Sequence, residues 1–249
     1  MAQALISGLV GCGVKPEMIT VADPSADIRQ QLGAKGLKTV DPTADATTAV
    51  KDADLVVLAV KPQVMKAVVS GSVAAGLSTE LLANMLGGYQ NIIRAMPNTP
   101  AMIQMGATGL YATDSISEPQ KQLATAAMEA SGLVMWVEDE EHLHAVTAVS
   151  GSAPAYMFYF LESMIDRGVA LGLDNEQASS LAMQTMLGAA KMAMGSDDTP
   201  AELRRKVTSP NGTTQAAIES MQADEVGRQI GEAMQACYDR SQALSEEMK

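Results

Sequence analysis

Two patterns of apolar and polar residues divide the chain, and one replaces the other near residue 145. Before that point, short apolar runs rich in β-branched residues alternate with stretches in which apolar residues recur at helical spacing. The run at 55–60 (LVVLAV) is apolar throughout, which is typical of a strand buried on both faces of a parallel sheet. This alternation predicts an α/β domain with a doubly wound parallel sheet.

The other elements of the first half follow the same alternation. Strands are predicted at 18–22, 37–40, 91–96, 106–112 and 133–137, and helices at 2–10, 25–35, 43–51, 63–69, 78–86 and 117–131. A further strand end is predicted near 72–76. Only about a dozen residues separate it from the strand at 55–60, which is short for a crossover between parallel strands. We therefore expect residues to be missing near 70–72.

Beyond residue 145 the strand patterns stop and helical spacing takes over. Helices are predicted at 154–168, 175–194, 200–206, 213–221 and 224–248. They carry more apolar surface than the outside of a monomer needs, which favours a helical dimer interface. We therefore expect two domains, an α/β domain over 1–146 and an all-α domain over 147–249.

Composition narrows the classes of function. The net charge is -12, and no cluster of basic residues could neutralise the phosphates of a nucleic acid. Cys12 and Cys237 are far apart, which argues against a disulfide framework or a metal site and fits a reducing cytoplasm. No apolar run approaches the ~18 residues of a membrane span.

His142 and His144 lie on different faces of a predicted helix, and we expect a solvated helix start there rather than a metal or acid–base site.

Candidate chemistry gathers where the predicted strands end. Ligands of doubly wound sheets bind beyond the carboxyl ends of the strands, and these ends carry Asp23, Lys61, 74–76 and 96–99. The layout indicates a Rossmann-type, dinucleotide-binding domain over 1–146. Its first strand and G-x-G-x-x-G turn would stand just before Ala2, so we expect that the sequence starts late. Lys61 either meets a cofactor or is a solvated lysine. Few titratable side chains are found among the candidate catalytic residues. This suits hydride transfer, in which the cofactor carries the chemistry.

A polar loop in the second half is the other candidate site. Residues 206–213 are rich in turn formers, including Pro210 and the pair Asn211-Gly212, and they lead into a helix start at Thr213. Unpaired backbone N–H groups and the helix dipole make such a place suitable for a carboxylate or phosphate. The alternative is an ordinary capped turn between two helices.

Six motifs in order resemble the pyrroline-5-carboxylate reductase family, and together they span essentially the whole chain. They are 58–62 (LAVKP), 72–76 (SVAAG), 94–100 (RAMPNTP), 106–109 (GATG), 150–156 (SGSAPAY) and 207–214 (VTSPNGTT). The resemblance implies the last step of proline biosynthesis, in which a hydride passes from NADPH or NADH to 1-pyrroline-5-carboxylate and gives L-proline.

The resemblance also implies roles for individual residues. Ser209, Gly212, Thr213 and Thr214 match the family's substrate loop, with the Thr214 hydroxyl at the ring nitrogen as the catalytic group. The cofactor-facing strand ends match Val60, Lys61, Pro62, Ala74, Ala75, Pro97 and Asn98. No metal is implied. Family members form interlocked homodimers, in which the two halves of a site come from different subunits, and the dimers often assemble into decamers.

Asp23 departs from the family pattern and bears on the choice of cofactor. NADPH users often place a serine or a basic residue at the end of the second strand. A carboxylate there would repel the 2′-phosphate and accept a hydrogen bond from a free ribose hydroxyl, so we expect NADH to be used at least as well as NADPH. The alternative is that Asp23 caps the helix that starts near Ser25.

Two other classes of function remain as alternatives. One is another NAD(P)-dependent imine or 3-hydroxyacid oxidoreductase. The 3-hydroxyacid enzymes usually present a catalytic lysine on the first long helix of the helical domain, and 156–168 contains none. The other is a cofactor-free binding or scaffold protein, in which the glycine turn would really be absent.

Overall fold

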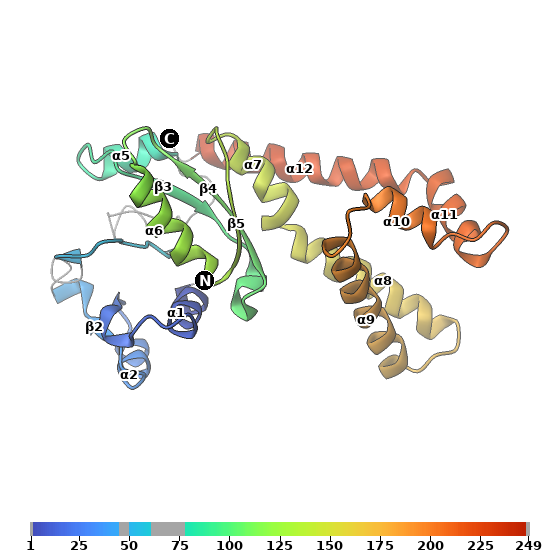
Figure 1. The fold of residues 1–249 in the computed structure, drawn as a ribbon, viewed down its shortest axis with the longest axis horizontal. Helices are drawn as coiled ribbons and strands as arrows, with labels where there is room; N and C mark the ends of the chain where they lie inside the picture. Colours follow the sequence, from blue (N-terminus) through green and yellow to red (C-terminus); the bar gives the residue numbers. More distant parts are fainter. Residues whose placement is uncertain (1, 45–49, 61–77, 248–249) are drawn as a thin grey trace. The chain divides into compact units, whose positions relative to one another are not determined.

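The computed structural model describes residues 2–44, 50–60 and 78–247. By contacts the chain forms two compact units, one made of Met1–Ser152 with Tyr238–Lys249 and the other of Ala153–Cys237. The first unit contains both sheets and the second contains long helices (Figure 1). The domain boundary predicted after residue 146 stays a proposal beside this division.

A small parallel sheet opens the first unit. After α1 (Ala2–Gly11) and the short helix η1 (Pro16–Met18), strand β1 (Thr20–Ala22) pairs with β2 (Lys38–Val40). Helix α2 (Ala26–Gly33) connects the two strands. It begins where the Ser25 hydroxyl accepts a hydrogen bond from the Ile28 N–H, and Leu32 is buried on its inner side. This strand–helix–strand unit confirms the predicted elements.

The second sheet has the order β3 (Ile93–Met96), β4 (Gly106–Ala112), β5 (Gly132–Trp136). Strands β4 and β5 are parallel and are joined by α6 (Glu118–Glu129), but β3 and β4 are antiparallel. The expectation that all strands are parallel was therefore wrong for this pair. Only residues 97–105 connect β3 to β4, including the short helix η3 (Thr99–Ile103), and that is too short for a parallel crossover.

The strand predicted at 55–60 was also wrong, because this segment belongs to no strand. Val56 and Val57 are 45% and 38% exposed rather than buried on two faces. A β-strand exists only through hydrogen bonds to its neighbours. Within 2–44, 50–60 and 78–247, no strand pairs with this segment. The predicted elements at 63–69 and 72–76, and the residues expected to be missing near 70–72, lie outside the described residues.

One face of the second sheet is packed against α1 and α6, and this is the main core of the unit (Figure 1). The buried residues Leu5, Leu110 and Met128 form its centre, with Val134 and Trp136 beside them. Gly8 lets α1 come close, because a Cβ there would lie 2.1 Å from the carbonyl oxygen of Ala130. A smaller core lies under α5 (Thr79–Met85).

Helix α7 (His142–Val146) and the π-helix η4 (Thr147–Gly151) follow the sheet, and they contact β4. Gly109 of β4 allows this contact, since a Cβ there would lie 2.7 Å from Cγ1 of Val146. Behind α7, the buried Arg94 forms an ion pair with Glu140 at 2.6 Å. The same carboxylate accepts hydrogen bonds from the Thr79 N–H and hydroxyl, so it also holds the start of α5.

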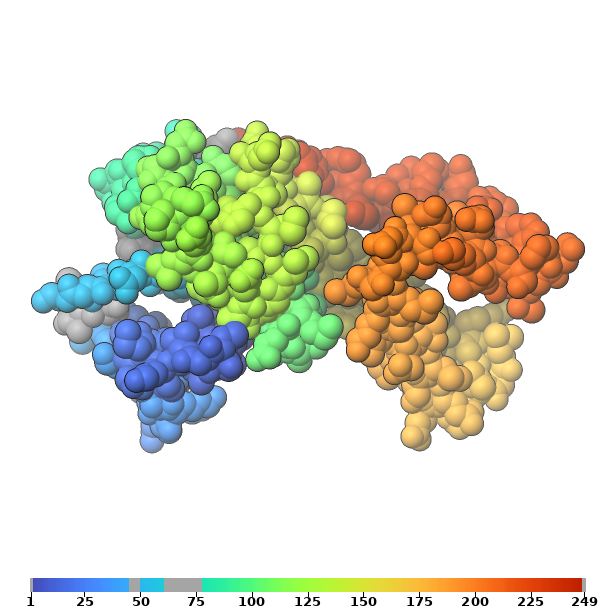
Figure 2. All heavy atoms as spheres, in the orientation of Figure 1, coloured from blue at the N-terminus to red at the C-terminus, as the bar shows by residue number. Residues whose placement is uncertain are grey.

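The second unit confirms the predicted helices. Its helices are α8 (Ala153–Ala170), α9 (Asn175–Met194), α10 (Pro200–Lys206), α11 (Thr213–Ala223) and the greater part of α12 (Val226–Glu247). Helices α8 and α9 pack closely at Gly168, where a Cβ would lie 3.1 Å from that of Ala178. Many of their apolar side chains are nevertheless exposed, and Figure 2 shows the surface of α9 (gold to orange) uncovered on the face in view.

Candidate functional site

The polar loop before α11 is a tight turn whose residues suit their positions. The Gly212 N–H donates to the carbonyl oxygen of Ser209 at 3.1 Å, which closes a four-residue turn. Pro210 takes the second position and Asn211, with φ of 58°, the third, as in a type II turn. The Asn211 N–H donates to Oε1 of Gln215 at 2.7 Å, which ties the turn to the first turn of α11.

The turn delivers the chain directly into the N-terminus of α11. Gly212 is the N-cap and has no side chain that could accept from the first N–H groups. The first N–H groups of a helix have no acceptor within the helix, and the helix dipole favours negative charge beside them. Ser209, Thr213 and Thr214 are all exposed here. The structure thus brings the four predicted substrate residues together around a helix start.

A short cluster of basic residues precedes this loop, contrary to the expectation that no basic residues are clustered. Helix α10 starts with a capping box, in which Thr199 and Glu202 exchange hydrogen bonds, and ends with Arg204, Arg205 and Lys206 in its last turn. Lys206 pairs with Asp198. Both arginines are exposed, and they lie in the last turn of the helix that leads into the candidate anion site. Their positive charge favours a carboxylate at the loop.

Asp23 lies directly after β1, as predicted, and part of its side chain is used locally. Its Oδ1 accepts a hydrogen bond from the Ser25 N–H at 2.8 Å, which fixes the turn into α2. Arg29 Nη1 donates to the carbonyl oxygen of Asp23 at 2.7 Å. Only one carboxylate oxygen serves the turn, so a role toward a ribose stays compatible with the local one. The alternative that Asp23 caps α2 is wrong, because Ser25 is the N-cap and Asp23 only fixes the turn that leads to it.

Asn98 and Pro97 follow β3, and the Asn98 side chain is buried and bonded within the protein. Its Nδ2 donates to the carbonyl oxygen of Ser150 at 3.1 Å, and its Oδ1 accepts from the Ala107 N–H at 2.9 Å. Asn98 therefore fixes the end of β3 against β4 and the π-helix. Val60 is half-buried at the end of the extended segment. Lys61, Pro62, Ala74 and Ala75 lie outside the described residues.

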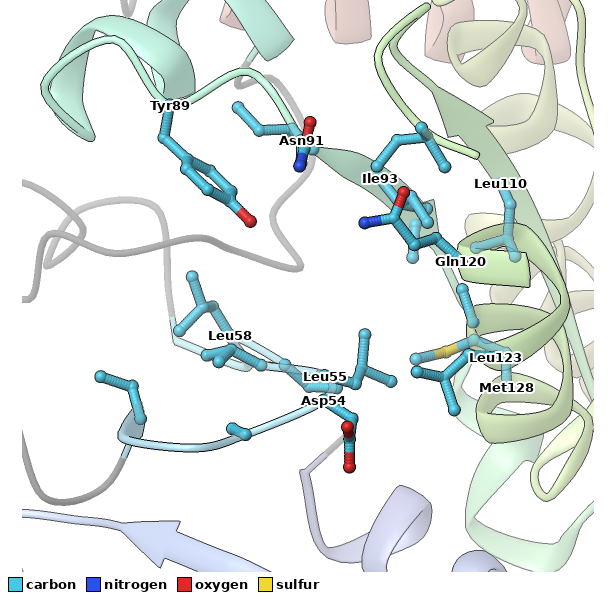
Figure 3. A pocket seen from close by; sticks show the side chains of 18 of the residues that line it. Asp54, Leu55, Leu58, Tyr89, Asn91, Ile93, Leu110, Gln120, Leu123 and Met128 are labelled. Carbon is cyan, nitrogen blue, oxygen red and sulfur yellow. The ribbon is translucent and has the colours of Figure 1, made fainter. Parts of the chain in front are cut away.

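A separate cavity of about 560 Å³ lies in the first unit (Figure 3). Leu55 and Leu58 line one side of it, and β3, β4 and α6 line the other, with Leu110 and Met128 among the lining residues. Asp23, Val60, Pro97 and Asn98 do not line it. Its walls are mainly apolar, and groups that could hold a pyrophosphate do not gather there. The cavity is thus a different place from these four cofactor residues.

His144 was wrongly predicted to be solvated, because it is 4% exposed. Its Nδ1 lies 2.7 Å from Oγ of Ser241, on the last turns of α12. Burial lowers the pKa of His144 below its ordinary value, although the carboxylate of Glu141 works in the opposite direction. The sequence carried one signal for this polar interior, namely the charged Arg94 within an otherwise apolar strand.

Two further observations concern metal binding and membrane insertion. Within the part of the chain that the structure describes, no three His, Cys, Asp or Glu side chains are grouped so that they could hold a metal ion. None of the described helices combines the length and the apolar character that crossing a bilayer requires.

Comparison with known proteins gives matches to both parts of the chain. Residues 140–244 match the family model described as pyrroline-5-carboxylate reductase dimerisation, and residues 1–87 match the model described as NADP oxidoreductase, coenzyme F420-dependent. The pyrroline-5-carboxylate reductase of Pseudomonas aeruginosa is 45% identical over 100% of this chain and 94% of its own length.

Solved structures agree. The pyrroline-5-carboxylate reductase of Coxiella burnetii is 38% identical and superposes with a TM-score of 0.92, covering 98% of this chain and 94% of that one. The Plasmodium falciparum enzyme, solved with NADP bound, is 25% identical with a TM-score of 0.84, covering 98% and 94%. The predicted fold class, a Rossmann-type domain followed by a helical dimerisation domain, is thereby confirmed. The chain belongs to the pyrroline-5-carboxylate reductase family.

Proposed function

We infer that this protein is an NAD(P)H-dependent oxidoreductase that reduces 1-pyrroline-5-carboxylate to L-proline, the final step of proline biosynthesis. The observation that carries this conclusion is 45% identity to a pyrroline-5-carboxylate reductase over the full chain. The confirmed fold class and the NADP-bound relative make NADPH or NADH the cofactor. The cofactor, when bound, supplies the hydride.

The substrate site is assigned to the loop before α11. A carboxylate fits beside the first N–H groups of α11, at Gly212, Thr213 and Thr214, with the Ser209 hydroxyl as a further donor. The exposed arginines of α10 add favourable charge. Held by its carboxylate, the ring would place its nitrogen at the Thr214 hydroxyl. Thr214 then orients the imine, whose protonated form accepts the hydride, and the loop needs no strong acid.

The cofactor side of the proposal comprises the strand ends. Asp23, Val60, Lys61, Pro62, Ala74, Ala75, Pro97 and Asn98 are the residues assigned to it. For Asn98 the hydrogen bonds to Ser150 and Ala107 support a positioning role, in which it holds the backbone after β3 in place. Asp23 offers its second carboxylate oxygen to the ribose.

The proposal extends to assembly. The match of residues 140–244 to a dimerisation model makes a homodimer the expected unit. We propose that the loop of one subunit serves the cofactor of its partner, as the resemblance to the family implies, and that a decamer is the larger assembly. A cytoplasmic location belongs to the same proposal, and it is favoured by Cys12 and Cys237, which form no disulfide.

Replacing the Thr214 hydroxyl tests the substrate site. In Thr214→Ala we expect kcat for proline formation to fall about 100-fold, the scale of a lost positioned donor, while the dissociation constant for NADH stays unchanged. Ser220→Ala, which removes an exposed hydroxyl from the same helix, is the matched control and should leave both constants unchanged. Unchanged turnover in Thr214→Ala would remove this residue from the site. Absence of proline-forming activity in the parent protein would refute the proposed function itself.

A further inference from the structure

Three charged side chains meet at the carboxyl ends of the two parallel strands β1 and β2. Asp23 follows β1 and Asp41 follows β2, and neighbouring parallel strands end at the same edge of the sheet. Arg29, from α2, reaches both places. Its Nη1 donates to the carbonyl oxygen of Asp23 at 2.7 Å, and its Nη2 lies 2.8 Å from Oδ2 of Asp41.

The ion pair between Arg29 and Asp41 is held in place from both sides. The Arg29 and Asp41 side chains are 20% and 34% exposed, so the pair is partly removed from solvent. Oδ1 of Asp41 accepts from the Thr43 N–H at 2.9 Å and from the Thr43 hydroxyl at 2.6 Å. These hydrogen bonds, and then the charge of Arg29, lower the pKa of Asp41, so it is ionised at neutral pH.

In the predicted dinucleotide-binding domain, β1 takes the place of the second strand. The end of that strand is where NADH and NADPH are distinguished. A carboxylate there accepts from the ribose 2′-hydroxyl of NADH, whereas a nearby arginine accommodates the 2′-phosphate of NADPH. This chain has both kinds of group. Its arginine, however, has one nitrogen on a backbone carbonyl and the other on a carboxylate. Two carboxylates and one guanidinium leave this edge with net negative charge, which opposes a phosphate.

We propose that Asp41 sets the cofactor preference of this protein by holding Arg29 in an ion pair, so that NADH binds better than NADPH. The inference rests on the proposed function only for the use of NAD(P)H. It differs from the expectation based on Asp23 alone, because it assigns the choice between NADH and NADPH to the ion pair of Arg29 and Asp41. Removing the charge of Asp41 leaves Arg29 with an unbalanced positive charge beside the ribose and favours the 2′-phosphate.

Asp41→Asn tests this, because asparagine keeps an oxygen for Thr43 while losing the charge. Fluorescence titration should give a dissociation constant for NADPH about five- to tenfold lower than in the parent, the scale of one partly exposed charge, with that for NADH changed less than about twofold. The ratio of kcat/KM values should shift equally. Asp27→Asn, which removes the same charge from an exposed position of α2, is the matched control and should leave the ratio unchanged.

A double variant identifies Arg29 as the group released. In Arg29→Gln the substitution Asp41→Asn should no longer improve NADPH binding, since the two residues act through one interaction. A gain that persists without Arg29, an unchanged NADPH constant in Asp41→Asn, or a parent that binds NADPH more tightly than NADH would each overturn the proposal. Nucleotide binding with the expected ratios but without reduction of 1-pyrroline-5-carboxylate would support this inference and refute the proposed function.

Discussion

His144 is buried, and its protonation state depends on the fold around it. Its Nδ1 and Oγ of Ser241 lie 2.7 Å apart, and its ring stands edge-on to that of Tyr238, with centroids 6.0 Å apart. Nε2 lies 3.8 Å from Oε2 of Glu141, and the charges of Arg94 and Glu140 also affect the pKa of His144. Burial outweighs the favourable carboxylates, so the folded protein holds a neutral ring at this position.

This predicts a stability that falls in mild acid. Because the pKa of His144 in the folded state lies below its ordinary value of 6.5, the unfolded chain takes up this proton first as the pH decreases. The free energy of unfolding should therefore decrease below about pH 6.5 and level off only once the folded ring is protonated too. The measurement is the urea midpoint of the protein and of His144→Gln between pH 7.5 and 5.

The comparison between the two histidines isolates the effect. His144→Gln should be less stable at pH 7.5 but should lose less stability than the parent protein as the pH falls. His142→Gln, at an exposed position two residues earlier, should keep the parent's pH dependence. Equal pH dependence in all three proteins would show that His144 does not titrate differently on folding.

The burial of His144 could not be predicted from the sequence, because the residue that covers it is far away along the chain. The spacing of His142 and His144 correctly puts them on different faces, but nothing local says which face is covered. The partner of His144 is Ser241, 97 residues later, on the last part of α12, which belongs to the first unit. By contrast, the turn at Pro210 and Asn211 was predictable, because turn geometry depends on the residues inside it.

At the scale of elements, the contact of α1 with the loop after α6 depends on one missing side chain. Ala4, Leu5 and Gly8 are the buried residues of α1. A Cβ at Gly8 would lie 2.1 Å from the oxygen and 2.7 Å from the carbon of the Ala130 carbonyl, and backbone atoms cannot move aside as a flexible side chain can. The sequence pattern located the helix, but the closeness of this contact appears only in the fold.

We predict that Gly8→Ala destabilises the protein by about 1–3 kcal/mol, the usual cost of overpacking, even though alanine is the better helix former. Urea denaturation measures this difference. Gly11→Ala is the matched control at the end of the same helix, since its nearest neighbour would be the side-chain nitrogen of Gln104 at 3.7 Å. That variant should be as stable as the parent or slightly more so, whereas equal stabilities of the two variants would mean that α1 shifts freely.

Helices could be predicted from the local sequence more completely than strands. The helix at 175–194 was predicted with its observed ends, because its capping residue Asp174 and its apolar spacing are local features. The apolar pattern of the extended segment at 55–60 was at least as distinct. Apolar side chains, however, predict only that a segment is packed against other parts of the chain. Whether a strand forms there depends on pairing partners elsewhere in the chain. The antiparallel β3–β4 pair does not follow from the alternation of patterns, because it depends on the length of the connection at 97–105, which is too short for a parallel crossover.

At the scale of the whole molecule, the helical unit carries apolar surface that the same unit does not bury. On α9, Leu181 is 60% and Met192 59% exposed, and the two lie about three turns apart on one face of the helix. On α8, Phe158 and Tyr159 are 66% and 70% exposed. Surface of this kind marks an interaction site, and the region belongs to the part of the chain that matches a dimerisation model.

The last prediction follows from that surface and concerns the homodimer. In Leu181→Glu we expect the dimer dissociation constant, measured by sedimentation equilibrium, to rise at least about tenfold, since burying one leucine is worth ~1.5–3 kcal/mol and each dimer loses two. Gln122→Glu, which adds the same charge at an exposed position of α6, should leave the constant unchanged. If a separate subunit cannot complete the site, proline formation by Leu181→Glu should fall on dilution and recover at high protein concentration, while NADH binding by the Rossmann-type unit persists. A variant that stays dimeric at all concentrations would place the interface on another face of the helical unit.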